Sequence, residues 1–168
     1  MFVKVVPLLL LISAASCIYH ECLLDLYPLP QNCSIGNPQQ NISISPCDII
    51  FRIYNQGLLP HFNEVLTQYM NLSYNCTKPN IKLIDSTPSA LGHGIYAVDI
   101  LVLDPSLRSV FTTIEEAYMI NAGVQNTTIR AGTYVSLIRA IDTFLQLISN
   151  TAETTDYFLN GLPIYIYD

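Results

Sequence analysis

The chain has 168 residues and carries 13 acidic against 7 basic side chains, a formal charge of −6 at pH 7. This acidic balance excludes nucleic acids and anionic membrane surfaces as expected ligands. Only 12% of the residues are charged while 51% are hydrophobic, a low ratio for an unmodified surface in water.

Residues 1–17 have the pattern of a secretory signal peptide, with one positive charge at Lys4, an apolar run, and small residues before Cys17. We prefer cleavage after Cys17, which leaves an even number of cysteines, to cleavage after Ser16. A bacterial lipoprotein site with Cys17 acylated is an alternative. No later segment is long and apolar enough to span a bilayer, so we expect a secreted chain or one held at a surface by a partner.

Five Asn-X-Ser/Thr acceptors for N-glycosylation follow the leader, and together with it they indicate passage through a eukaryotic secretory pathway. Their asparagines are Asn32, Asn41, Asn71, Asn75 and Asn126. Glycans at these positions would offset the low charge of the surface.

The first half of the mature chain predicts an arm followed by a strand and a helix. Four prolines break any periodicity in residues 18–46, which we expect to form an extended, glycosylated arm. Residues 49–54 are β-branched and aromatic and predict a strand. A helix follows from about Pro60, with apolar residues at helical spacing and Asn71 closing it.

The second half predicts three more strands and two helices. Residues 81–85 and 95–103 predict strands, the latter central because both of its faces are apolar apart from Asp99. Asp104-Pro105 predicts a helix start and Gly123 its end. A second helix runs from about Thr133 to Ser149, and the linker between the two helices should face solvent at Asn126.

Residues 162–167 close the chain as a strand, at an edge or with Pro163 at its start. The resulting order is β-α-β-β-αα-β, in a single α+β domain over residues 47–168. We expect an antiparallel or mixed sheet with helices packed on one face.

Four mature cysteines allow three disulfide connectivities, and the sequence does not select one of them. Topology favours Cys47–Cys76, because the helix should return the chain to the place where the first strand begins. Cys22–Cys33 would then tie down the arm. No Cys-X-X-Cys or metal-ligand spacing occurs, so we expect structural disulfides and neither metal nor cofactor.

The candidates for chemistry are few. His93 lies between two glycines in a loop, where it could act as a general base with Asp85 or Asp99 behind it. An exposed histidine in a glycine-rich loop is the favoured interpretation. Glu115 and Glu116 diverge on a helix and do not form a carboxylate pair.

Asp99, in the most apolar strand, requires a partner if it is buried, and Arg52 is the candidate. We expect this pair to be structural. Eleven tyrosines, among them Tyr165 and Tyr167 near the C-terminus, provide amphipathic surface suited to a protein interface.

Residues 16–22, Ser-Cys-Ile-Tyr-His-Glu-Cys, and the later Pro46-Cys47 resemble the start of the coronavirus accessory immunoglobulin-like glycoproteins. That resemblance covers about thirty residues and implies a secreted viral protein, although those domains are all-β. Herpesvirus glycoprotein L is similar in class, as a small, secreted, disulfide-bonded partner of a membrane glycoprotein.

The sequence therefore predicts a secreted, N-glycosylated, non-enzymatic protein that binds another protein, as a viral factor acting on a host molecule. An unanchored subunit of a viral envelope glycoprotein complex is the first alternative. An extracellular hydrolase using His93 is the second.

Overall fold

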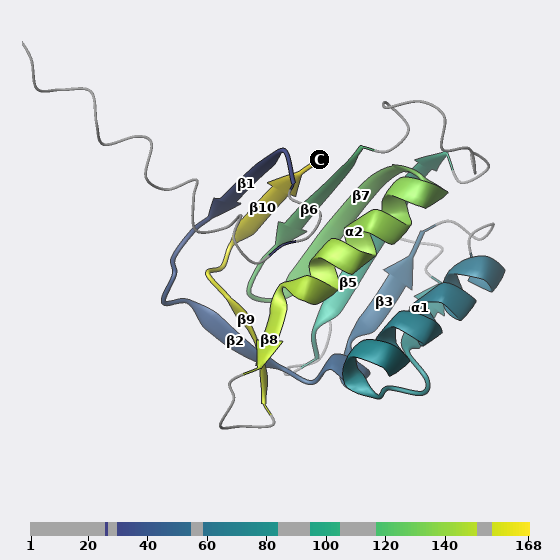
Figure 1. Cartoon of the computed structure of the whole chain (residues 1–168), viewed down its shortest axis with the longest axis horizontal. Helices are drawn as coiled ribbons and strands as arrows, with labels where there is room; N and C mark the ends of the chain where they lie inside the picture. Colours follow the sequence, from purple (N-terminus) through teal and green to yellow (C-terminus); the bar gives the residue numbers. More distant parts are fainter. Residues whose placement is uncertain (1–25, 27–29, 55–58, 84–94, 105–116, 151–155) are drawn as a thin grey trace, which may run out of the picture.

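A computed structural model describes residues 26, 30–54, 59–83, 95–104, 117–150 and 156–168. They form a mixed seven-stranded sheet and a three-stranded sheet, with helices α1 and α2 on one face of the larger sheet (Figure 1). The predicted α+β class, with a mixed sheet and helices on one face, is confirmed. No helix in these residues is long and apolar enough to cross a membrane.

The described elements follow in chain order. They are β1 (Asn32–Ile35), β2 (Asn41–Ile44), the 3-10 helix η2 (Pro46–Asp48), β3 (Ile50–Ile53), α1 (Leu59–Tyr74), β4 (Asn80–Leu83), β5 (Ala97–Asp104), β6 (Tyr118–Ala122), β7 (Asn126–Thr133), α2 (Tyr134–Gln146), β8 (Ile148–Asn150), β9 (Tyr157–Asn160) and β10 (Ile164–Tyr167).

The larger sheet has the strand order β1-β10-β6-β7-β5-β3-β4. Strands β4, β3, β5 and β7 pair in parallel, whereas β6, β10 and β1 continue the sheet with antiparallel pairing. Helix α1 provides the crossover that parallel β3 and β4 require. Strand β5 lies in the interior between β7 and β3, as predicted from its apolar faces.

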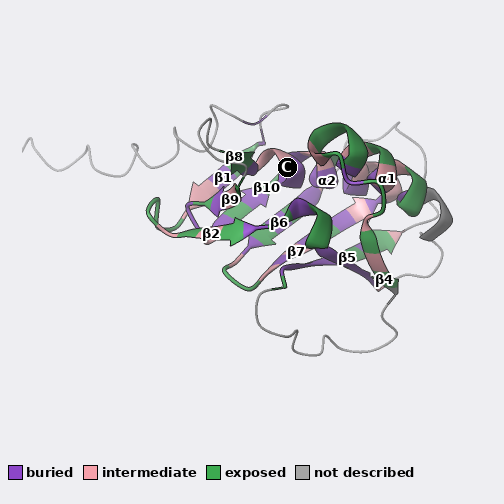
Figure 2. Cartoon of the chain, turned by 90° about the horizontal axis from the view of Figure 1, so that it is seen from below, coloured by how far each residue is buried: buried purple, intermediate pink, exposed green. Residues whose placement is uncertain are grey.

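The hydrophobic core lies between the helices and the sheet face that they cover (Figure 2). Helix α1 contributes Phe62, Leu66 and Met70, which recur every four residues and are fully buried. Helix α2 contributes Leu137 and Phe144, also fully buried. At roughly 1.5–3 kcal/mol for each large apolar side chain removed from water, this layer is the main source of stability.

Both helices have identifiable ends. Thr133 caps α2: its hydroxyl accepts a hydrogen bond from the Ser136 N–H, and the Ser136 hydroxyl accepts one from the Thr133 N–H. Helix α1 continues past Asn71, where we expected it to end, and stops at Tyr74 because Asn75 adopts a left-handed conformation with φ 57°.

Two predictions for residues 104–133 are wrong where the structure describes them. Residues 118–122, assigned to the end of a helix, form strand β6, in which buried and exposed residues alternate. Asn126, assigned to a solvent-facing corner, begins the interior strand β7. The Gly123 N–H donates to the Asn126 carbonyl at 2.8 Å, so Gly123 closes a hairpin between β6 and β7. Residues 105–116 lie outside the described part.

The segment expected as an arm supplies β1 and β2, which pair with β10 and β9 near the C-terminus. Strand β10 is therefore interior, and the edge position considered for it is wrong. Pro163 precedes the strand, so its missing N–H removes no hydrogen bond from either ladder. The preceding turn requires a glycine: Gly161 has φ 80°, and a Cβ there would lie 2.5 Å from Ile35 Cγ2.

Candidate functional site

A buried polar cluster lies on the sheet face opposite the helices, at the centre of the larger sheet. Strand pleating places Phe51, Val98 and Ile100 toward the core, and Arg52 and Asp99 toward the other face. Arg52 and Asp99 are aligned on adjacent parallel strands. They are only 4% and 6% exposed, so each charge needs partners within the protein.

Asp99 receives three hydrogen bonds. Arg52 Nη2 donates to Asp99 Oδ2 at 2.5 Å, Asn126 Nδ2 donates to the same oxygen at 3.0 Å, and the Tyr54 hydroxyl donates to Oδ1 at 3.0 Å. Burial, followed by the hydrogen bond to Asp99, raises the pKa of the Tyr54 phenol. The predicted Arg52–Asp99 pair is confirmed. Tyr54 and Asn126 are further members of the cluster that sequence reasoning did not identify.

This arrangement holds a charge rather than exposing a reactive group. Both oxygens of Asp99 are engaged, and the donors come from strand β3, the residue that follows it, and strand β7. Hydrogen bonds to a charged partner are shorter and stronger than those between neutral groups. The chemistry of the cluster is therefore that of an electrostatic cross-link between β3, β5 and β7.

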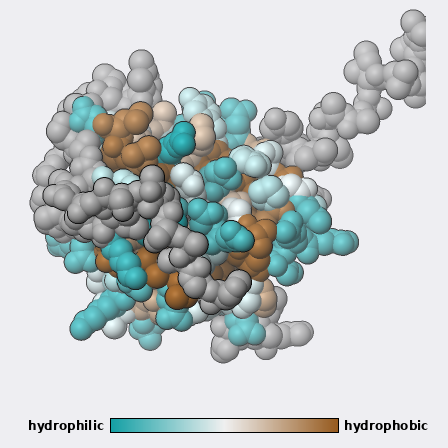
Figure 3. All heavy atoms as spheres, turned by 180° about the vertical axis from the view of Figure 1, so that it is seen from behind, coloured by the Kyte–Doolittle hydropathy of each residue, from teal (hydrophilic) through white to brown (hydrophobic). Residues whose placement is uncertain are grey.

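A row of exposed side chains crosses the same face beside this cluster. The strand registers align Asn32, Tyr167, Met119, Arg130 and Leu101 on five successive strands. Tyr167 is 46% exposed, Met119 45% and Leu101 40%. Seen from behind, this side of the molecule shows hydrophobic patches between hydrophilic side chains (Figure 3). The half-exposed tyrosines expected near the C-terminus are thus present.

Other tyrosines form hydrogen bonds inside the molecule. The number of tyrosines in the sequence does not indicate which of them are buried in this way. The Tyr96 hydroxyl donates to the Gly123 carbonyl and lies 2.8 Å from Thr127 Oγ1. Burial raises the pKa of Tyr96 to about 12, although the hydrogen bond to Thr127 opposes the increase. Tyr74 links the helices, because its hydroxyl donates to the Leu145 carbonyl at 2.6 Å.

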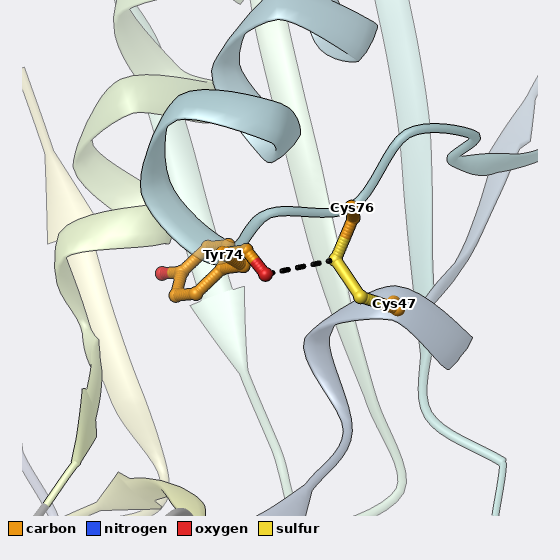
Figure 4. Close-up of a disulfide and its surroundings, with 3 residues drawn as sticks. All are labelled: Cys47, Tyr74 and Cys76. Atoms are coloured by element: carbon orange, nitrogen blue, oxygen red, sulfur yellow. Dashed lines mark hydrogen bonds between the residues drawn. A yellow bond between two sulfur atoms is a disulfide. The ribbon is translucent and has the colours of Figure 1, made fainter.

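The disulfide between Cys47 and Cys76 is present as predicted, with a Cα–Cα distance of 5.4 Å (Figure 4). It joins η2 to the residues after α1. The Tyr74 carbonyl oxygen lies 3.7 Å from Cys76 Sγ, which is a contact only, because an oxidised sulfur has no proton to donate. Cys33 is also disulfide-bonded, and its predicted partner Cys22 lies outside the described residues.

Most candidate catalytic residues lie outside the part of the chain that the structure describes. His93, Asp85, Glu115 and Glu116 all lie outside the described residues, as does His20. Within the described part of the chain, no three His, Cys, Asp or Glu side chains are grouped so that they could hold a metal ion.

The five glycosylation acceptors occupy two kinds of position. Asn32, Asn41, Asn71 and Asn75 are exposed, the first two on edge strands β1 and β2 and the others at the end of α1. Asn126 is only partly exposed and its amide belongs to the Asp99 cluster.

Comparisons with known proteins give structural likeness only. No protein-family model matches the sequence, and no curated protein matches it. The fold is similar to part of a chitobiase from Flavobacterium johnsoniae, with a TM-score of 0.59 and 15% identity over 88% of this chain. It is also similar to part of an exo-β-N-acetylglucosaminidase of family GH20 from Vibrio harveyi, with a TM-score of 0.56 and 16% identity over 93% of this chain.

An N-acetyl-β-hexosaminidase from Streptomyces plicatus is a third structural neighbour, with a TM-score of 0.53 and 18% identity over 87% of this chain. The matched part is 21% of the chitobiase chain, 20% of the Vibrio chain and 26% of the Streptomyces chain. This chain thus spans about a fifth to a quarter of the length of these neighbours.

These likenesses overturn the expectation of a non-enzymatic binding protein, because the fold occurs within glycoside hydrolases. His93, on which the hydrolase alternative was based, lies outside the described residues. The resemblance of residues 16–22 to viral glycoproteins stays a prediction.

Proposed function

We propose that this chain contributes one domain to a glycoside hydrolase of the β-N-acetylhexosaminidase type. The observation that supports the proposal is the fold match, which extends over 88% of this chain but only 21% of the chitobiase chain. The same disproportion recurs in the Vibrio and Streptomyces enzymes. A segment that reproduces a fifth of such enzymes is most simply one of their domains.

Within that hydrolase we assign the domain a framework role. Glycoside hydrolysis generally employs carboxyl groups that exchange protons with the substrate or stabilise its transition state. Asp99, the buried carboxylate of the described part, is instead held by Arg52, Tyr54 and Asn126 and cross-links three strands. Its hydrogen bonds favour rigidity of the sheet over proton transfer.

An immunodepletion experiment tests the proposal on the native protein, in extracts of the cells that produce it. An antibody raised against residues 30–168 is used to deplete native extracts, and β-N-acetylglucosaminidase activity is followed with a chromogenic β-N-acetylglucosaminide. We expect activity to leave the supernatant with the chain and to be recovered on the antibody. Activity that stays in a supernatant free of the chain would contradict the proposal.

The recombinant chain, assayed alone, distinguishes a framework domain from a catalytic one. We expect no turnover of the chromogenic substrate. Turnover that disappears in His93→Ala would reject the framework role and assign the chemistry to the chain itself.

We also propose that the chain is exported and carries N-glycans. The leader pattern of residues 1–17 supports export, as does the Cys47–Cys76 disulfide, because disulfides persist in oxidising compartments. Expression of the full chain in eukaryotic cells should yield an oxidised, glycosidase-sensitive product in the medium. Retention of a reduced, unmodified chain inside the cells would contradict export.

A further inference from the structure

We infer that glycosylation of this chain is selective: Asn32, Asn41, Asn71 and Asn75 are the acceptors, and Asn126 is a structural residue that carries no glycan. This inference rests on the proposed export and is independent of the proposed glycosidase role. The sequence does not separate the five positions, because all satisfy the same Asn-X-Ser/Thr pattern.

The chemistry of the modification concerns one atom of each asparagine. The side-chain Nδ2 attacks the anomeric carbon of a lipid-diphosphate-linked oligosaccharide. A C–N bond forms, the bond from that carbon to the diphosphate oxygen breaks, Nδ2 loses one proton and the lipid diphosphate leaves. The folded protein must then leave room for a saccharide beside that nitrogen.

At Asn126 this nitrogen is already engaged in a hydrogen bond. Its Nδ2 lies 3.0 Å from Asp99 Oδ2, and Asp99 is only 6% exposed. A sugar on that nitrogen would have to lie beside a buried carboxylate that also accepts hydrogen bonds from Arg52 and Tyr54. It would desolvate polar groups of the sugar or displace a donor from the cluster, and either change is unfavourable.

The backbone of Asn126 is equally restricted. Its carbonyl accepts the Gly123 N–H at 2.8 Å in the hairpin between β6 and β7. On the other side the residue is in register with Ala97, which is fully buried in β5. The hairpin and the central β5–β7 ladder therefore hold the main chain of Asn126 in place beside Asp99.

The four other acceptors lie at the periphery. Asn32 is on β1, an edge strand of the larger sheet, and Asn41 is on β2, an edge strand of the smaller one. Asn71 lies in the last turn of α1, and Asn75 follows it in the left-handed conformation that ends the helix. All four are exposed, so glycans there extend into solvent.

Site mapping tests this division directly. The full chain is secreted from eukaryotic cells, its glycans are removed by peptide N-glycosidase in ¹⁸O-water, and the peptides are sequenced by mass spectrometry. We expect ¹⁸O-labelled aspartate at positions 32, 41, 71 and 75 and unlabelled asparagine at 126. Label at position 126, or its absence from the four exposed positions, overturns the inference.

A pair of variants separates the acceptor role of Asn126 from its structural role. Thr128→Val removes the acceptor pattern but keeps the asparagine side chain and a β-branched strand residue. We expect its mass and its Tm to match those of the unaltered chain. Asn126→Ala should also leave the glycan mass unchanged but lower the Tm by about 3–6 °C, since a hydrogen bond to a carboxylate is lost.

The matched control is Asn71→Gln at an exposed acceptor, which should remove one glycan mass. A loss of one glycan mass in Thr128→Val would show that Asn126 is modified. An unchanged Tm in Asn126→Ala would show that its amide has no structural role. Either result would contradict the inference.

Discussion

At the scale of single residues, the clearest constraint is the charge of Asp99 in the middle of the sheet. Asp99→Ala leaves the Arg52 guanidinium buried without its carboxylate. Removing one partner of a buried pair typically costs about 3–5 kcal/mol, because the remaining charge loses that partner. We therefore expect the free energy of unfolding, measured by urea denaturation of the oxidised chain, to fall by that amount.

The control for this prediction is Tyr54→Phe, which removes one hydrogen bond from Asp99 and keeps the ion pair. It should cost only about 1–2 kcal/mol. If Asp99→Ala costs no more than Tyr54→Phe, the ion pair does not stabilise the sheet as described.

Tyr96 should make the free energy of unfolding decrease as the pH becomes alkaline. Burial raises its pKa from 10.0 to about 12, so the folded state holds the phenol proton more tightly than the unfolded state. The stabilisation from this group is complete below pH 10 and is lost as pH rises from 10 to 12. Tyr96→Phe should therefore flatten the decrease in unfolding free energy over that range, measured by urea denaturation at several pH values.

Thr127→Val is a control that should change the pKa of Tyr96 without removing its phenol. The Thr127 hydroxyl lowers that pKa, so the variant should raise it. Removal of the hydroxyl should extend the alkaline decrease to higher pH. Identical pH profiles for Tyr96→Phe and the unaltered chain would show that Tyr96 titrates alike in both states.

Some members of the Asp99 cluster could be predicted from the sequence and others could not, for a physical reason. A lone acid in an apolar strand must be paired when buried, so Asp99 and Arg52 could be connected without coordinates. Asn126 could not be connected to them, because the apparent helix before it placed it in a solvent-facing corner. Its contact with Asp99 exists only because β7 pairs with β5.

At the scale of elements, α2 was predictable because its own sequence encodes it. Its apolar stripe, including Leu137 and Ile141, and its cap at Thr133 act within the helix. Strand β6 was missed because Ile114 and Tyr118 are spaced four residues apart and extend a helical pattern into it. Its alternation is short, and its pairing with β7 and β10 is not visible in its own residues.

The cap of α2 stabilises the start of the helix through one hydroxyl group. Thr133→Ala removes the hydroxyl that accepts the Ser136 N–H and should lower the unfolding free energy by about 1 kcal/mol. Thr133→Ser keeps the hydroxyl and should recover most of that loss. The two variants can be compared by thermal unfolding followed by far-ultraviolet circular dichroism. Equal losses would assign the effect to packing of the threonine methyl group.

At the scale of the whole molecule, the chain is closed by pairing of its two ends. Strands β1 and β2 precede β10 and β9 by more than a hundred residues and still pair with them. Such pairing depends on the folded sheet as a whole. The hydrophobic periodicity of a short segment does not show which distant strand it will pair with. The residues before Pro46 were therefore expected to be an arm, although they contain two strands.

The disulfide could be predicted because it follows from the path of the chain through one strand and one helix. Cys47 and Cys76 enclose a loop with a sequence separation of 29 residues, and this loop contains all of β3 and α1. In the chain-entropy model, a closed loop of this size stabilises the folded state by about 3.5 kcal/mol, because it restricts the unfolded chain. Replacing both cysteines with alanine should therefore reduce the unfolding free energy by that order.

The measurement is urea denaturation of the secreted double variant beside the unaltered chain, with and without a reductant. Since Cys33 is also disulfide-bonded, the reductant should destabilise the double variant further, and this second decrement reports the remaining bridge. The unaltered chain should lose both contributions on reduction. A double variant as stable as the oxidised parent would mean that α1 packs against the sheet strongly enough for the cross-link to add nothing.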